Sequence, residues 1–316
     1  MISKIEIEKI TAKTSFIKNK LEQVYRMLSL LQEINRHPIS ERLALKGGTV
    51  INHFFFDYPR LSIDLDFDFT IPVKKEKLAD EIKAIASGLE SIFRFFKYEF
   101  KSRSQEGFLA YQALYDTLWD GKEALKVEVN FLLRQPLEEP RQIETRSPFD
   151  FKFKVRTLSV EEIYAAKTTA LFTRTQPRDL FDIYHLISQG NLRFEKDKLK
   201  NFFYFYASLS KIPFSEFKIE NIKALPDKEI ENYLWPLLRV ANRASKAKML
   251  KAITLFLNEM LSPSAKQKEY LQSFYDKKPN FNLLFSGNLS KALMQHPMVL
   301  WRQQQMQGVP KSNKPS

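Results

Sequence analysis

The chain has 316 residues, a formal net charge of +13 and no cysteine. The absence of cysteine excludes a disulfide scaffold and any thiolate nucleophile or thiolate metal site. The basic excess indicates a polyanionic partner, either nucleic acid or an anionic surface, although many bacterial proteins are basic without one.

No apolar run approaches the roughly 20 residues that a membrane span requires. The first residues, MISKIEIEKITAK, lack the continuous apolar segment of a secretory signal. We therefore expect a cytoplasmic protein without a membrane partner. A zinc site is not expected, because the histidines are scattered without ligand-like spacing. They are His37, His53, His185 and His296.

Two amphipathic helices are predicted in the first hundred residues. In residues 12–36, apolar side chains recur every three or four positions, and the dipeptide His37-Pro38 ends the pattern. The same periodicity predicts a second helix over residues 74–94.

Between these helices, an alternating segment at residues 61–67 predicts a strand. Side chains on a strand alternate between its faces, so Asp64 and Asp66 point to one side and the apolar residues point into a core. Two adjacent carboxylates repel each other unless a cation neutralises them. Magnesium fits such hard oxygen ligands better than zinc does.

A small-residue turn, Gly47-Gly48-Thr49, precedes this strand. Glycine permits positive φ and lets backbone N–H groups approach a phosphate closely. Thr49 is predicted to cap a helix that begins at Val50, and helix N-termini attract anions. The turn and the Asp-x-Asp strand, in this order, indicate a nucleotide site.

Three further strands are predicted over residues 95–102, 108–118 and 124–134, and Asp120-Gly121 forms a hairpin turn between the last two. In the third strand, Glu128 lies on the face opposite the valines. It is either a third site carboxylate or an ordinary solvated glutamate.

After a proline-containing loop at residues 136–148, two helices are predicted. Ser159 with Glu162 forms a capping box, and Lys167 lies within that helix. The next helix runs from Pro177 to a stop at Gly190. Its Asp179 and Asp182 share a face, and these helices alone would be interpreted as surface helices with ion pairs.

The rest of the chain is predicted to be helical over residues 244–260, 265–275 and 288–306, with an interruption at Pro297. The aromatic run at residues 202–206 can stack on bases, but such a dense run is more often core. We expect domains at residues 1–190 and 191–306. Residues 307–316 form a polar, disordered tail.

The motif Lys46-Gly47-Gly48-Thr49, followed by Arg60-x-Ser62-x-Asp64-Leu65-Asp66-Phe67, resembles the nucleotidyltransferase superfamily, in particular the AbiEii/AbiGii-type toxins. The pairs Glu162/Lys167 and Arg178-Asp179/Asp182 match later elements of that family in the same order. The resemblance covers about residues 45–187. It implies an α+β fold with a small mixed sheet flanked by helices and followed by a helical C-terminal domain.

The resemblance also implies roles for individual residues. Asp64 and Asp66 would hold two Mg²⁺ ions, and Glu128 would share one of them. Lys167 would neutralise nucleotide phosphate, and Asp182 or Asp179 would orient that lysine or the attacking hydroxyl. The remaining implied nucleotide-binding residues are Lys46, Gly47, Gly48, Thr49, Arg60 and Ser62. Arg60 is alternatively a structural ion-pair partner.

The implied function is metal-dependent transfer of a nucleoside monophosphate from an NTP to a hydroxyl, with the 3′ end of tRNA as acceptor, and growth inhibition or phage defence as its role. A cognate antitoxin is the expected protein partner. Two alternatives stay open from the residues. One is a phosphotransferase that uses the same site, and the other is a non-catalytic module that binds RNA or protein.

Overall fold

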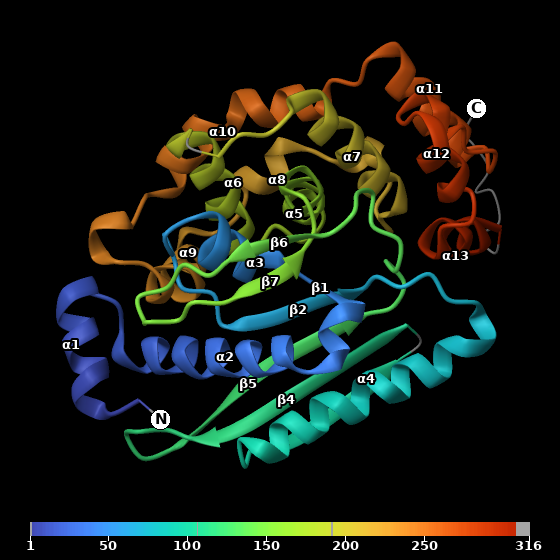
Figure 1. Cartoon of the computed structure of the whole chain (residues 1–316). Coiled ribbons are helices and arrows are strands. Elements are labelled where there is room, and N and C mark those ends of the chain that lie inside the picture. Colours follow the sequence, from blue (N-terminus) through green and yellow to red (C-terminus); the bar gives the residue numbers. More distant parts are fainter. Residues whose placement is uncertain (1, 106, 191, 308–316) are drawn as a thin grey trace.

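A seven-stranded mixed sheet forms the centre of the computed structural model, which describes residues 2–105, 107–190 and 192–307 (Figure 1). The strand order is β3-β4-β5-β2-β1-β7-β6. Helices pack on the sheet, which confirms the predicted α+β class. The strands are β1 (Leu43–Lys46), β2 (Asp64–Phe69), β3 (Glu99–Gln105), β4 (Phe108–Asp116), β5 (Lys122–Asn130), β6 (Arg141–Glu144) and β7 (Lys154–Thr157).

Strand β2 occupies the middle of the sheet, antiparallel to β1 and parallel to β5. The register places Asp66 opposite Glu128 and Asp64 opposite Lys126. In-register neighbours on adjacent strands project from the same face of a sheet. The topology therefore brings carboxylates from two separate parts of the sequence onto one face.

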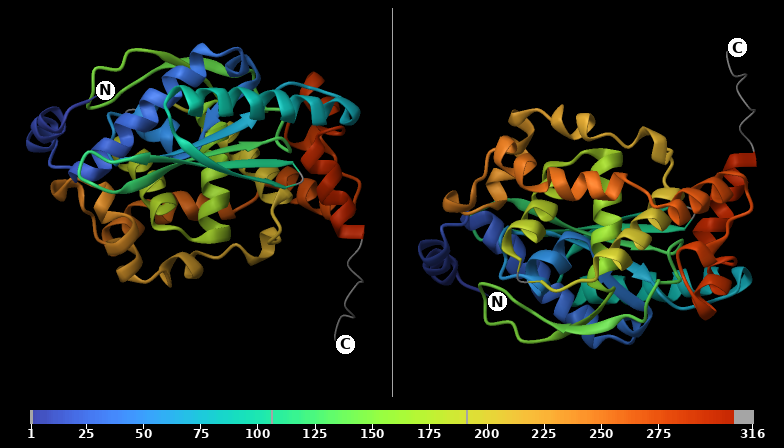
Figure 2. Two further views of the ribbon diagram at one scale, coloured as in Figure 1. Left: turned by 90° about the horizontal axis from the view of Figure 1, so that it is seen from below. Right: turned by 90° about the horizontal axis from the view of Figure 1, so that it is seen from above.

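Helices α2 (Lys18–Arg36) and α4 (Lys75–Phe95) cover one face of the sheet, as the left view of Figure 2 shows. Their buried apolar positions, such as Leu28 and Leu89, follow the helical period. The helix predicted over residues 74–94 is confirmed.

The helices in yellow-green to orange lie on the opposite side (Figure 2), where α7 packs against α5 and α10 packs against α6. The predicted start at Pro177 and the predicted interruption at Pro297 are confirmed, as is the stop at Gly190, which has a φ of +60°. The remaining helices are α1 (Lys4–Thr14), α3 (Gly47–Val50), α5 (Val160–Arg174), α6 (Pro177–Gln189), α7 (Lys196–Leu209), α8 (Ile219–Lys223), α9 (Asp227–Tyr233), α10 (Lys246–Leu261), α11 (Ala265–Tyr275), α12 (Gly287–Leu293) and α13 (Pro297–Gln307).

The aromatic run in α7 belongs to the core. Phe202, Phe203, Tyr204 and Phe205 are all buried, and only Tyr206 is partly exposed. The core interpretation of this run is therefore confirmed, and these four rings are not available to stack on bases.

The single helix predicted over residues 12–36 is wrong. The chain forms α1 and α2 instead, because Ser15 adopts a left-handed conformation (φ +60°) that ends α1. The N–H of Ser15 donates to the carbonyl of Thr11, and α2 then starts after Ile17, which occupies the N-cap position without a side-chain hydrogen bond. Apolar periodicity continues across such a break, so it does not reveal the break.

Several strand limits also differ from the prediction. The central strand covers residues 64–69 rather than 61–67, and β3 begins at Glu99 because α4 continues to Phe95. Strands β6 and β7 were not predicted, and β6 lies inside the predicted loop at residues 136–148. Both are only four residues long, too short for alternation to be recognised.

The last part of the chain needs one correction. Gln307, assigned to the disordered tail, lies at the end of α13, and residues 308–316 lie outside the described residues. The predicted domain limit at residue 190 stays a prediction. No helix in the described ranges is long and apolar enough to cross a membrane.

Candidate functional site

Three carboxylates form a row across β2 and β5. Asp64 and Asp66 project from the same face of β2, and Glu128 lies beside Asp66 on β5. Burial raises the pKa of Asp66, Lys46 lowers it, and the nearby Asp64 and Glu128 raise it further. The site therefore disfavours the full negative charge of this row until a cation is added.

The outer two carboxylates each have a basic partner. Arg178 Nη1 lies 3.0 Å from Asp64 Oδ2, and Lys126 Nζ lies 2.5 Å from Glu128 Oε1. Within the described part of the chain, Asp66 forms no ion pair. It is thus the carboxylate whose charge is least compensated.

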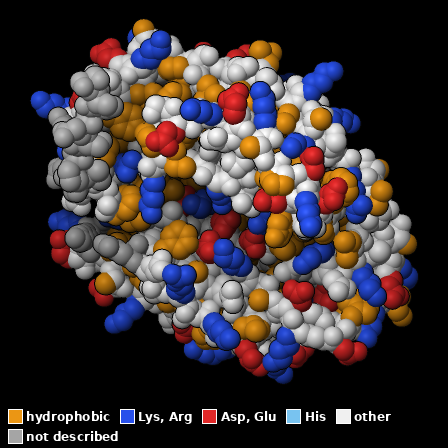
Figure 3. Space-filling view, turned by 180° about the vertical axis from the view of Figure 1, so that it is seen from behind, with side chains coloured by type: hydrophobic (Ala, Val, Ile, Leu, Met, Phe, Trp, Pro, Cys, Tyr) orange, Lys and Arg blue, Asp and Glu red, His pale blue; other side chains and the backbone are white. Residues whose placement is uncertain are grey.

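Asp66 and Glu128 line a cavity of about 270 Å³. Figure 3 shows a hollow in the corresponding side of the molecule, where acidic and basic side chains gather. The wall combines charged groups with apolar ones, as a site for a nucleotide does. The lining residues are Lys46, Gly47, Asp66, Phe67, Asp68, Phe108, Glu128, Asn130, Leu133, Leu158, Ile163, Ala166, Lys167, Ala170, Arg174 and Tyr206.

A further carboxylate, Asp68, lies on the same strand and was missed by the sequence analysis. It is buried, and Lys46 Nζ lies 2.5 Å from its Oδ1. Asp68 continues the alternation of Asp64 and Asp66, so extending that pattern by two residues would have found it. The pair holds the Lys46 ammonium at the edge of the cavity.

The glycine turn approaches the carboxylate row closely. Gly47 has a φ of +74°, and a Cβ atom on it would lie 2.9 Å from Asp66 Oδ2. A Cβ atom on Gly48 would lie 2.5 Å from Arg60 Nη2. Both positions thus require glycine, the first for conformation and space and the second for space.

The predicted role of Thr49 as a helix cap is wrong. Helix α3 begins at Gly47, and the Thr49 hydroxyl instead donates to the carbonyl of Asp64 (2.5 Å) and contacts Ser62 Oγ at 3.1 Å. Both Thr49 and Ser62 are buried. The hydroxyl of Thr49 therefore fastens the turn to β2 rather than facing the cavity.

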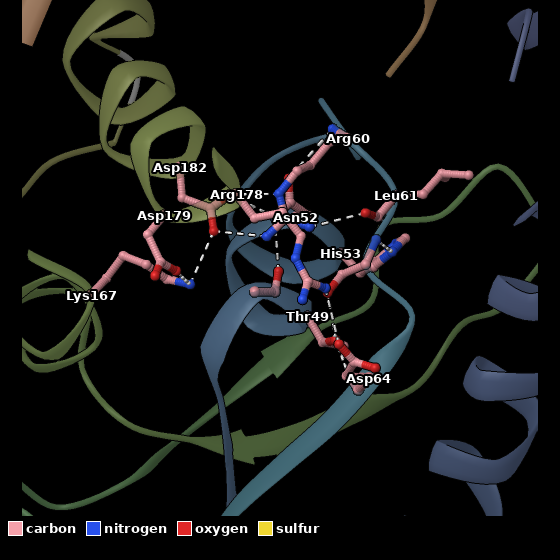
Figure 4. A network of polar contacts seen from close by, with 12 residues as sticks. Thr49, Asn52, His53, Arg60, Leu61, Asp64, Lys167, Arg178, Asp179 and Asp182 are labelled. Carbon is pink, nitrogen blue, oxygen red and sulfur yellow. Dashed lines mark hydrogen bonds and ion pairs between the residues drawn. The ribbon is translucent and has the colours of Figure 1, made fainter. Parts of the chain in front are cut away.

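Behind the turn, four buried charged side chains, Arg60, Lys167, Asp179 and Asp182, form an ion network (Figure 4). The exposed side chain of Arg174 joins the network at its rim. Arg60 donates to both carboxylate oxygens of Asp182, at 2.8 and 2.7 Å. Lys167 Nζ lies 2.9 Å from Asp179 and 3.1 Å from Asp182, and Arg174 Nε lies 2.7 Å from Asp179. Three cations and two carboxylates leave this network one unit positive.

Asn52 connects the network to the glycine turn. Its amide nitrogen donates to the carbonyl of Gly48 (2.8 Å) and to Asp182 Oδ1 (3.1 Å). Asn52 lies in a short π-helix, Ile51–Phe55, a rare conformation that is frequent at functional sites. The sequence contains no pattern that would have identified it.

The network strongly favours ionised carboxylates. Burial raises the pKa of Asp179, but Lys167 and Arg174 outweigh it and lower that pKa to about 2. Burial also raises the pKa of Asp182, but Arg60 and Lys167 outweigh this effect and lower that pKa below its ordinary value. Lys167 thus lies between two ionised aspartates, and Arg60 is a buried ion-pair partner of Asp182.

The capping box predicted at the start of α5 forms only in part. Ser159 Oγ accepts from the N–H of Glu162, but the Glu162 carboxylate turns elsewhere. It accepts from the N–H of Leu137 and from the hydroxyl of Tyr206. Its other oxygen, Oε2, has no hydrogen-bond partner among the described residues.

The predicted site residues thus separate into two groups. Lys46, Gly47, Asp66, Glu128 and Lys167 line the cavity, and Asp64 lies beside it with 30% of its side chain exposed. The others support them from behind; they are Thr49, Arg60, Ser62, Asp179 and Asp182, which are buried, and Gly48, which is partly buried.

The donor set suits a hard cation only in part. In residues 2–105, 107–190 and 192–307, no three histidine or carboxylate side chains are grouped to hold a metal ion on their own. Asp64 and Asp66 offer two adjacent carboxylates, the oxygen ligands that Mg²⁺ prefers. Mg²⁺ commonly takes its other ligands from water and substrate phosphates.

Comparisons with known proteins identify the family. The family described as "Nucleotidyl transferase AbiEii toxin, Type IV TA system" matches residues 29–267. A comparison with the curated proteins gives no match.

Solved structures give the fold. MenT4, a nucleotidyltransferase toxin from Mycobacterium tuberculosis H37Rv, superimposes with a TM-score of 0.62 at 14% identity, over 95% of this chain and 99% of that chain. An antigenic nucleotidyltransferase-like protein from Paracoccidioides brasiliensis has a TM-score of only 0.34, with 19% identity over 53% of this chain and 76% of that chain. That score is too low to support an argument.

Proposed function

The chain belongs to the AbiEii family of nucleotidyltransferase toxins of type IV toxin–antitoxin systems, and we propose that Asp64, Asp66 and Glu128 are its catalytic carboxylates. The observation that carries this proposal is the row they form across β2 and β5 at the cavity. The reaction would join an acceptor hydroxyl oxygen to the α-phosphorus of an NTP. The bond to the β-phosphate would break and release pyrophosphate.

Mg²⁺ held by Asp64 and Asp66 would supply charge stabilisation for the triphosphate and lower the pKa of the acceptor hydroxyl. The raised pKa of Asp66 supports this assignment, since a cation would relieve the repulsion within the row. Glu128 would contribute to the same site from β5, with its proximity to Lys126 limiting its freedom.

The basic residues would bind the triphosphate. Lys46 and Lys167 both line the cavity, and each is held by aspartates, which fixes the position of its ammonium group. The ion network that contains Lys167 carries an excess positive charge, which favours a phosphate nearby. The backbone of Gly47, free of a Cβ, would lie along the phosphates.

We propose the 3′ end of tRNA as the acceptor, with a block of translation as the consequence. The net charge of +13 suits a polyanionic acceptor and would make its binding depend on salt. The family of toxin–antitoxin proteins implies an antitoxin as the second partner.

The deciding experiment incubates purified protein with bulk tRNA, Mg²⁺ and each α-labelled NTP in turn, with Asp66→Ala as the control. Label on tRNA from one NTP, absent in the control and after EDTA treatment, is expected. Label from a γ-labelled NTP instead would indicate a phosphotransferase. Toxicity that persists in Asp64→Ala would indicate a non-catalytic module.

A further inference from the structure

The three strands at one side of the sheet have two different faces. On β4, Leu109 and Tyr111 are buried on the face that α4 covers, whereas Gln112 on the opposite face is exposed. Strand β3 is the edge strand, and its Lys101 and Arg103 are exposed. The face opposite α4 is therefore accessible there.

The strand register connects this face directly to the carboxylate row. Arg103 pairs with Ala110, Ala110 pairs with Glu128, and Glu128 pairs with Asp66. Cross-strand neighbours share a face, so these four side chains form one line across the sheet. Adjacent strands lie about 4.8 Å apart, so Arg103 is about 14 Å from Asp66 across the strands.

A second line runs beside the first. Lys101 pairs with Gln112, Gln112 with Lys126, and Lys126 with Asp64. Each line thus begins with a basic residue at the sheet edge and ends at a carboxylate of the proposed catalytic centre. In the first line, Ala110 lies between Arg103 and Glu128, and its small side chain does not obstruct the surface there.

Charge and ring chemistry narrow the choice of ligand. Within the described ranges, Lys101 and Arg103 form no ion pair, so their charges are available to a polyanion. Phe108, at the start of β4, lies on the same face and pairs with Asn130 of β5. Both side chains line the cavity. Basic side chains beside an aromatic ring are how proteins bind single-stranded nucleic acid without sequence preference.

We propose that this face, formed by Lys101, Arg103, Gln112, Lys126 and Phe108 and called here the acceptor platform, binds the single-stranded terminal segment of an RNA acceptor. The segment would cross β3, β4 and β5, and its terminal hydroxyl would reach Asp64 and Asp66. This inference rests on the proposed function and deepens it by locating the acceptor. An unpaired end is required, because Phe108 can stack only on a base released from a duplex.

The first test measures binding and needs no catalysis. A fluorescent single-stranded RNA is titrated by anisotropy against the full chain and the double variant Lys101→Ala/Arg103→Ala. The matched control is Lys77→Ala/Lys83→Ala, two exposed lysines on α4, on the other side of the same sheet. We expect the platform variant, and not the control, to bind at least about tenfold more weakly.

Salt dependence makes this test specific. Removing two phosphate contacts should reduce the slope of log K against log [salt] by about 1.4, since each contact on a single strand contributes about 0.7. The charge-preserving variant Lys101→Arg/Arg103→Lys should retain most of the affinity. Equal affinity of platform and control variants, or no RNA binding by the wild type, would overturn the proposal.

The second test separates this proposal from the proposed function. In the transfer assay, the platform variant should raise KM for the acceptor RNA about tenfold and leave KM for the NTP within twofold. Transfer with an unchanged RNA KM would overturn the platform alone. RNA binding that depends on the platform, without any transfer, would overturn the proposed function alone. If the platform variant lost antitoxin binding while its RNA affinity stayed unchanged, the face would be assigned to a protein partner, and the platform proposal would be overturned.

Discussion

The molecule contains two adjacent groups of charged residues, the ion network and the carboxylate row, whose buried carboxylates differ in their cationic partners. In the ion network, Asp179 and Asp182 each contact two cationic side chains and remain ionised. In the carboxylate row, Asp66 has like charges as neighbours, and its pKa is raised. Each aspartate of the network is therefore compensated by two cations, whereas Asp66 forms no ion pair within the described residues.

This difference indicates a structural role for the ion network and a catalytic role for the carboxylate row. The two carboxylates of the network already contact cationic side chains, so they gain little from an added cation, and the network holds Lys167 and the glycine turn in place. A row of carboxylates with unbalanced charge gains most when a cation binds. We therefore expect substitutions in the network to change stability first and substitutions in the row to change activity first.

The strongest disruption of the network should be Asp182→Ala. It leaves Arg60, which is 2% exposed, without its bidentate partner, and breaking a buried ion pair typically costs about 3–5 kcal/mol. Chemical denaturation of the wild type and the variant measures the difference. Asp57→Ala, at an exposed position, is the control and should change little. A loss below about 1 kcal/mol for Asp182→Ala would contradict the structural role of the network.

The opposite behaviour is expected for Asp66→Asn. Loss of the carboxylate that we propose to bind Mg²⁺ should lower nucleotidyl transfer at least about 100-fold, equivalent to about 3 kcal/mol of transition-state stabilisation. Stability should be unchanged or higher, because the raised pKa shows that the folded state disfavours the ionised carboxylate. Transfer rates and melting temperatures are measured together.

Asp116→Asn, on an exposed position of β4, serves as the matched control for this variant. A variant Asp66→Asn that unfolds easily, or that transfers at the wild-type rate, would remove the distinction between the two groups.

Glu162 on α5 is a third case, a buried carboxyl group that belongs neither to the ion network nor to the carboxylate row. Burial, the largest effect, raises its pKa to about 7, while the Leu137 N–H and the Tyr206 hydroxyl act in the other direction. The unfolded chain releases this proton near its ordinary pKa of 4.5, whereas the folded chain retains it until about 7. Between these values the folded state binds more protons, so stability falls as the pH rises.

Between pH 4.5 and 7, we expect the free energy of unfolding of the wild type to fall by on the order of 2–3 kcal/mol more than that of Glu162→Gln. This variant keeps an acceptor oxygen but has no titrating proton. Denaturant unfolding at several pH values measures it. Parallel pH profiles of the two proteins would show that folding does not raise the pKa of Glu162.

The smallest effect is expected at the rim of the network. Arg174 contacts Asp179, but 59% of its side chain is exposed, so Arg174→Ala should cost only about 0–1 kcal/mol. Denaturant unfolding in low and high salt measures it. A loss as large as that of Asp182→Ala would mean that the rim, and not Arg60, stabilises the network.

Much of the site was evident in the sequence because its signals are local. Alternation placed Asp64 and Asp66 on one face, and the glycine turn precedes them in the sequence at residues 47–49. The helix limits at Pro177 and Gly190 follow from the backbone preferences of those residues alone. The break at Ser15 and the four-residue strands were missed, because a left-handed residue or a short strand leaves no periodic signal.

The sequence by itself thus determined the residue types of the site, since these depend on period and local conformation, and the family resemblance that those residues carry implied the fold class. The tertiary structure alone decided which polar residues face the cavity. Arg60 and Asp182 are 122 residues apart, and only the tertiary structure brings Asp182 of α6 to Arg60 and Asn52. It also decided that the face of β3, β4 and β5 stays accessible, because alternation defines the two faces of a strand and not what covers them.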